Sequence, residues 1–150
     1  MTHPMIQPGD QVTDDQVLRI YDGLRARTLP VAEWTHGAHL CAGTGFWYDQ
    51  GLGDAEATMP DAIREYNLSV GTQNTDQAGY HHTITLFYLR VIARELANRR
   101  DETIGALATS VLNSPIADRA YPHRFYSKPV LFSVEARRDW LAPDLKPLSP

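Results

Sequence analysis

Hydrophobic residues recur along most of this 150-residue chain at the three- and four-residue spacing of an α-helix. The first run follows Thr13 and Gln16, which can form a capping box, and predicts a helix over residues 14–27. A second helix begins at Pro30 or after a cap at Thr35 and extends to Gln50. Later runs predict helices at residues 54–70, 77–98, 102–113 and 133–141. No alternating strand pattern is present, so we expect an all-α helical bundle of about five to six helices.

Prolines and glycines limit the helical region. They interrupt residues 1–12, which we expect to form a flexible leader. Residues 13–142 have the length of a single helical domain, although the pattern becomes irregular after Pro115. Three further prolines predict an extended tail over residues 143–150.

The composition of the chain argues against several classes of function. The chain is 43% hydrophobic with a net charge of −4, and no cluster of basic residues suggests a nucleic-acid partner. The single cysteine, Cys41, lies in an apolar run and cannot form an internal disulfide. Neither a signal peptide nor a membrane-spanning run is present, so we expect a cytoplasmic protein without a membrane partner.

Four of the six histidines lie in two short clusters. His36 and His39 stand one helical turn apart in residues 34–40, and His81 and His82 lie in residues 79–83. Short connections favour antiparallel neighbours, which makes the second and fourth helices parallel and places both clusters at the same end of the bundle. The sequence therefore predicts one histidine-rich site.

An open three-histidine site is a known way to hold a catalytic metal ion. We expect His36, His39 and His81 to be the ligands of a divalent transition metal, and imidazole ligands suit zinc, iron, copper or nickel. The predicted function is a metal-dependent enzyme that acts on a small polar molecule. H-x-x-H is a loose pattern, however, and histidines at such positions also serve as ordinary hydrogen-bonding residues.

Other polar residues fall near the same end. His82 is an alternative ligand or an acid/base, and Tyr66 is a second candidate catalytic residue. Four residues are candidates for positioning the substrate: Arg64, Asn67, Asn74 and Tyr80.

Two alternatives stay open. In one, the protein is a non-catalytic helical domain that binds a small molecule or a partner protein. In the other, it is a metal-free enzyme in which His81 acts as the base, oriented by Tyr80 or Asn67. Aromatic residues near Trp140 would also permit a homodimer.

Three segments resemble those of a family of small bacterial all-helical proteins. They are Leu-Pro-x-x-x-Trp-Thr-His-x-Ala-His-Leu at residues 29–40, Ile-Arg-x-Tyr-Asn at 63–67 and Gly-Tyr-His-x-Thr at 79–83. Members of that family often have Glu where this chain has His82, which leaves the ligand set open. The resemblance implies a shared site but no particular reaction. A looser similarity to the DinB-like metal-binding bundles concerns architecture alone.

Overall fold

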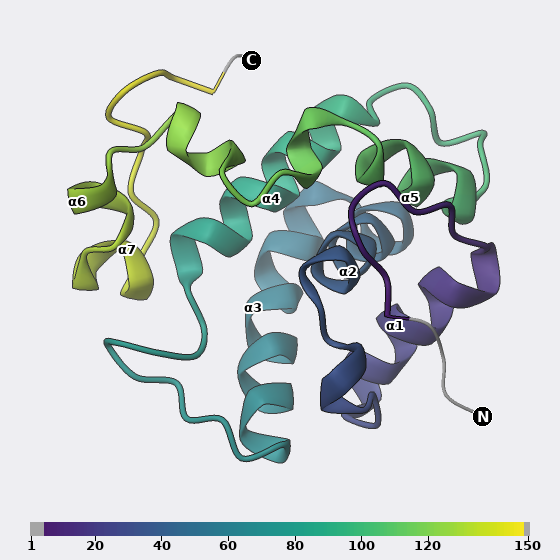
Figure 1. The fold of residues 1–150 in the computed structure, drawn as a ribbon, viewed down its shortest axis with the longest axis horizontal. Helices are drawn as coiled ribbons and strands as arrows, with labels where there is room; N and C mark the ends of the chain where they lie inside the picture. Colours follow the sequence, from purple (N-terminus) through teal and green to yellow (C-terminus); the bar gives the residue numbers. More distant parts are fainter. Residues whose placement is uncertain (1–4, 149–150) are drawn as a thin grey trace.

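The computed structural model describes residues 5–148, and within them the chain is all-helical with no strand, as predicted (Figure 1). The seven α-helices are α1 (Asp14–Ala26), α2 (His36–Gln50), α3 (Leu52–Ser69), α4 (His82–Glu95), α5 (Ile104–Leu112), α6 (Lys128–Leu131) and α7 (Val134–Arg138). Three short 3-10 helices complete the described part, namely η1 (Val31–Glu33), η2 (Pro115–Ala117) and η3 (Tyr121–Arg124).

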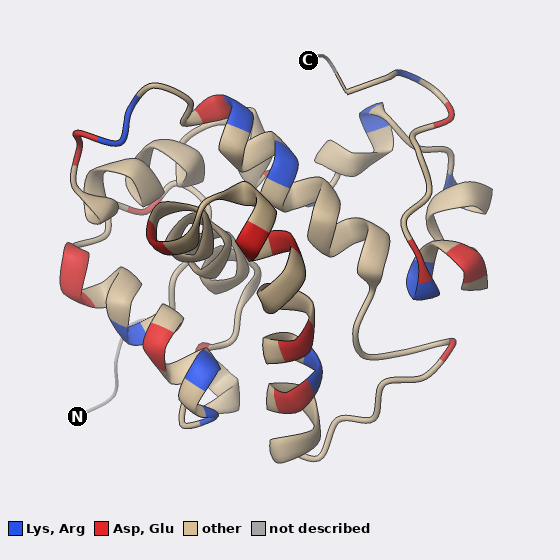
Figure 2. Cartoon of the chain, turned by 180° about the vertical axis from the view of Figure 1, so that it is seen from behind, with Lys and Arg blue, Asp and Glu red and all other residues tan. Residues whose placement is uncertain are grey.

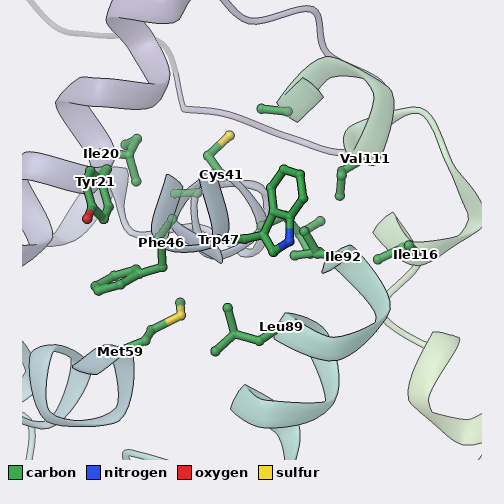
Figure 3. Close-up of a cluster of buried hydrophobic side chains, with 14 of the residues drawn as sticks. Ile20, Tyr21, Cys41, Phe46, Trp47, Met59, Leu89, Ile92, Val111 and Ile116 are labelled. Carbon is green, nitrogen blue, oxygen red and sulfur yellow. The ribbon is translucent and has the colours of Figure 1, made fainter. Parts of the chain in front are cut away.

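Helix α2 is the centre of the bundle. It contacts α1, α3, α4 and α5, and ten of its fifteen residues are buried. Small residues permit this close packing; a Cβ added at Gly45 would stand only 3.0 Å from the ring of Tyr21 on α1. Figure 3 shows the core around α2, with side chains from every neighbouring helix: Ile20, Tyr21, Cys41, Phe46, Trp47, Met59, Leu89, Ile92, Val111 and Ile116.

The predicted caps explain where the first two long helices begin. Thr13 and Gln16 form the expected capping box at α1, and Thr35 caps α2 by accepting a hydrogen bond from Ala38 N. Helix α5 begins at Ile104, two residues later than predicted, and the Thr103 side chain supplies its capping oxygen. Helix α4 begins five residues later than predicted, since residues 70–81 form a loop instead of its first turn.

The segments that flank the helices are packed against them. Within the predicted leader, residues 5–12 include buried Ile6, and Gly9 N donates a hydrogen bond to Leu112 O. Within the predicted tail, Leu145 N donates to Phe125 O. Residues 1–4, including His3, and residues 149–150 lie outside the described part. Trp140, near which aromatic residues would permit a homodimer, is partly buried beneath the Arg90 guanidinium, which lies 4.0 Å from the centroid of its ring.

Charged residues are unevenly distributed among the helices. Helix α3 is mainly acidic, with Arg64 as its single basic residue, whereas α2 is uncharged apart from Asp49 near its end (Figure 2). The two histidines therefore lie at the uncharged start of the central helix. Among the described residues, no helix is both long enough and apolar enough to cross a membrane.

Candidate functional site

The first turn of α2 fixes the orientation of both of its histidines. His39 Nδ1 lies 2.7 Å from the carbonyl oxygen of Thr35, and His36 Nε2 lies 3.0 Å from that of Ala117 in η2. A carbonyl oxygen only accepts, so each of these ring nitrogens carries the proton and donates. The remaining nitrogens, His36 Nδ1 and His39 Nε2, have lone pairs and no hydrogen-bond partner among the described residues. Two basic nitrogens are thus left available on one helical turn.

Both histidines line a cavity of about 370 Å³ between α2, α3 and α4. One part of its wall is apolar and comes from all three helices: Leu40, Gly43, Met59, Ile63, Ile84 and Leu89. The other part is polar, with Thr35, Thr85, Tyr88 and Arg119 beside the two histidines. Trp34 also lines the cavity and stacks on His39, with ring centroids 3.7 Å apart. An apolar cavity with a few convergent polar groups is the usual form of a small-molecule site.

The surroundings of both imidazoles lower their pKa values. Burial lowers the pKa of His36 below the ordinary value of 6.5, and the positive charge of Arg119 lowers it further. Burial also lowers the pKa of His39, to about 4. The His39 ring is nevertheless exposed where it lines the cavity, and water there stabilises the imidazolium and opposes this lowering. The lowered pKa leaves both rings unprotonated at pH 7, each with a lone pair on one nitrogen, and makes each ring a weaker base than free imidazole.

Arg119 and Tyr88 complete the polar part of the wall. Neither side chain has a hydrogen-bond partner, and Arg119 has no ion pair, among the described residues. The Tyr88 ring lies edge-on to His36 at 5.8 Å, and burial raises the pKa of its phenol, so the hydroxyl keeps its proton. Asp118 precedes Arg119 and accepts a hydrogen bond from Ala120 N, 2.9 Å away.

The structure does not bring His81 to this cavity. His81 is the N-cap of α4, where its Nδ1 accepts from Ile84 N at 3.1 Å, while its Nε2 donates to Leu131 O at 2.8 Å. Both ring nitrogens are therefore engaged. Tyr88 faces His36 from two turns further along α4, about 10 Å of helix rise away from His81. The two histidine clusters are consequently separate.

His82 also lies outside the cavity wall. Its Nδ1 is 2.8 Å from the hydroxyl of Tyr80, and the Arg64 guanidinium stands 4.3 Å from the centroid of the Tyr80 ring. Burial and the charge of Arg64 lower the pKa of His82. These three predicted site residues therefore form a cluster of their own, between α3 and the start of α4, and none of them lines the cavity.

The predicted amide pair holds the loop between α3 and α4. Asn74 Oδ1 accepts from both Asn67 Nδ2 and Tyr80 N, and Asn74 Nδ2 donates to Arg64 O. Tyr66 is fully buried, and its hydroxyl donates to Leu29 O at 2.8 Å. Asn67 and Asn74 therefore stabilise the loop, and Tyr66 connects α3 to the segment before η1; none of the three lines the cavity.

A metal ion at this site would have few ligands from the protein. Among residues 5–148, no group of three or more His, Cys, Asp or Glu side chains is placed to hold one. His36 and His39 supply two nitrogens, and the nearby charge of Arg119 opposes a cation. Their bonds to backbone carbonyls are nonetheless typical of metal-ligating histidines.

Arg119, Thr85 and Tyr88 also line the cavity, although the sequence did not predict them there. Arg119 lies in the irregular stretch after Pro115, where helical periodicity assigns no residue to a face. Comparison of the chain with family models, with curated proteins and with solved structures gave no match. The resemblance of its motifs to a bacterial family stays a prediction, and the site is interpreted from its own geometry.

Proposed function

We propose that this protein is an enzyme acting on a small polar molecule in the cavity, with His36 and His39 as neutral acid/base residues. The single observation that supports this most is that His36 and His39 line one cavity and that each has an unpartnered ring nitrogen, Nδ1 of His36 and Nε2 of His39. Each ring is fixed through its other nitrogen, as a general base must be if it is to meet a substrate in a defined orientation.

Both rings are held in a fixed orientation and are able to transfer a proton. The His39 ring is held by Thr35 O and by stacking on Trp34, and the lowered pKa keeps it unprotonated at pH 7. His36 also has a lowered pKa, and its ring donates to Ala117 O in η2. One nitrogen would accept a proton from the substrate, and the imidazolium so formed would return it to the product or to water.

A metal-dependent enzyme is the second candidate, favoured by the hydrogen bonds from both rings to backbone carbonyls. His36 Nδ1 and His39 Nε2 would be two of the ligands, and water or substrate would supply the others. Zinc, iron, copper and nickel all accept imidazole nitrogen, and a bound ion would act as a Lewis acid.

One experiment tests both candidates. The purified protein is incubated with a metabolite extract, and depleted or new compounds are identified by mass spectrometry. The His36→Gln/His39→Gln double variant and the His82→Gln variant are run in parallel, each with and without a chelator. The second variant is a matched control, since His82 lies outside the cavity wall.

The metal-free proposal predicts turnover that resists the chelator, is lost in the double variant and persists in the control. Turnover that the chelator abolishes, with near-stoichiometric metal in the untreated protein, would replace it with the metal-dependent candidate. No change in any compound, or equal turnover by the double variant, would refute catalysis at this site.

A further inference from the structure

The polar wall of the cavity contains a positive charge, that of Arg119, which has no role in the proton transfer proposed for the two histidines. Arg119 is the one arginine or lysine among the residues that line it. Its positive charge lowers the pKa of both His36 and His39, so the guanidinium lies close enough to act electrostatically on both rings. Because it has no ion pair among the described residues, its charge is available to a ligand.

Two neighbouring features favour an anion at the same place. The Tyr88 phenol keeps its proton and has no hydrogen-bond partner among residues 5–148, so it is a free neutral donor. The first turn of α2 lines the cavity too, and the positive end of a helix dipole attracts negative charge. The negative charge of Asp118 raises the pKa of His36 and of Tyr88 and therefore disfavours an anion. Asp118, however, lies outside the cavity wall.

The apolar wall limits what the rest of the ligand can be. Leu40, Met59, Ile63, Ile84 and Leu89 offer no hydrogen bond, so hydroxyl or amide groups placed against them would lose their bonds to water. A sugar phosphate fits poorly for this reason, and a single arginine supplies little charge for a dianion. A molecule with one carboxylate and an apolar body fits both walls.

We propose that the cavity binds a small carboxylic acid, with Arg119 and Tyr88 holding the carboxylate and the apolar wall holding the hydrocarbon body. Arg119 is suited to this because a guanidinium pairs with a carboxylate through two parallel hydrogen bonds. This substrate class rests on the proposed function, because it names the molecules that would meet His36 and His39. The apolar body would lie along the apolar wall, where Ile84 is partly exposed while Met59 and Leu89 are buried beside α2 (Figure 3).

The test is a binding series with matched acids and amides. Butyrate, hexanoate, octanoate, benzoate and phenylacetate are titrated into the protein by isothermal calorimetry and by NMR, each beside its uncharged primary amide. The variants are Arg119→Gln, Arg119→Lys and Tyr88→Phe, with Arg124→Gln as the control. Arg124 is an exposed arginine of η3 that does not line the cavity, and its loss changes the net charge equally.

We expect at least one acid to bind about tenfold more tightly than its amide, and Arg119→Gln to weaken the acid by about tenfold or more. Arg119→Lys should restore part of the loss, and Arg124→Gln should change the affinity less than about twofold. The bound acid should raise the pKa of His39, since a nearby negative charge favours the imidazolium.

Three results would overturn the proposal: no acid binds at millimolar concentration, acid and amide bind equally, or Arg119→Gln binds the acid as the wild type does. Its failure differs from that of the proposed function. Acids that bind through Arg119 without being transformed would leave the ligand class intact and refute catalysis. Histidine-dependent turnover of an uncharged compound would support catalysis and refute the carboxylic acid as the ligand class.

Discussion

Replacing His81 separates the structural role found for this residue from the ligand role that the sequence predicts. In His81→Ala, Ile84 N loses its capping acceptor, which costs about 1 kcal/mol. Leu131 O loses a donor, and an unsatisfied buried carbonyl costs about 1–3 kcal/mol. The free energy of unfolding should therefore fall by about 2–4 kcal/mol. At about 2–4 °C per kcal/mol for a chain of this size, the Tm should drop by roughly 4–16 °C.

The assay is urea and thermal unfolding followed by circular dichroism, with His81→Asn as the matched variant. The asparagine oxygen still caps the helix but does not reach the carbonyl of Leu131, so the loss should be intermediate. A His81→Ala protein within about 0.5 kcal/mol of the wild type would refute both hydrogen bonds. His81 would then be free to act at the site, as the sequence pattern predicted.

The remaining predictions concern the cavity and the loop beside it. Stability to urea should fall between pH 7 and pH 5, because histidines of the unfolded chain take up protons near pH 6.5 while the folded pKa values of His36 and His39 lie lower. The His39→Gln variant should show a shallower fall, and a fall equal to that of the wild type would contradict a neutral His39 ring. Asn74→Ala removes three hydrogen bonds and should lower the free energy of unfolding by about 2–3 kcal/mol, measured by urea denaturation, whereas an unchanged midpoint would show that the loop is not held this way. Arg119→Gln should raise the pKa of both histidines in NMR titrations while Arg124→Gln leaves them unchanged, and equal shifts in both variants would contradict a local charge.

The all-helical class and several helix starts could be predicted because they depend on neighbouring residues. Thr13 and Gln16 lie three apart before an apolar run, and Thr35 precedes another, so local spacing alone indicates both caps. The pairing of His36 with His39 follows in the same way from one helical turn. Both residues line the cavity, and this part of the candidate site was visible in the sequence.

The third histidine could not be placed because its partner is remote. His81 bonds to the carbonyl of Leu131, fifty residues away, in a four-residue helix too short to leave a periodic signal. The same bond places the ring at the N-cap of α4, so the helix begins later than its apolar pattern suggested. Arg119 could not be predicted as a cavity residue for a related reason, since irregular backbone after Pro115 brings it to the cavity.

The most direct test of the central claim is a long-range ¹H–¹⁵N NMR spectrum of the histidine rings at pH 7, assigned with the His36→Gln and His39→Gln variants. The account predicts two neutral rings in opposite tautomers, with the proton on Nε2 of His36 and on Nδ1 of His39, leaving one basic nitrogen of each ring facing the site. Addition of a bound carboxylic acid should then move the ¹⁵N signals of these two unprotonated nitrogens. A protonated imidazolium at either position, or the same tautomer at both, would contradict the arrangement from which the function is inferred.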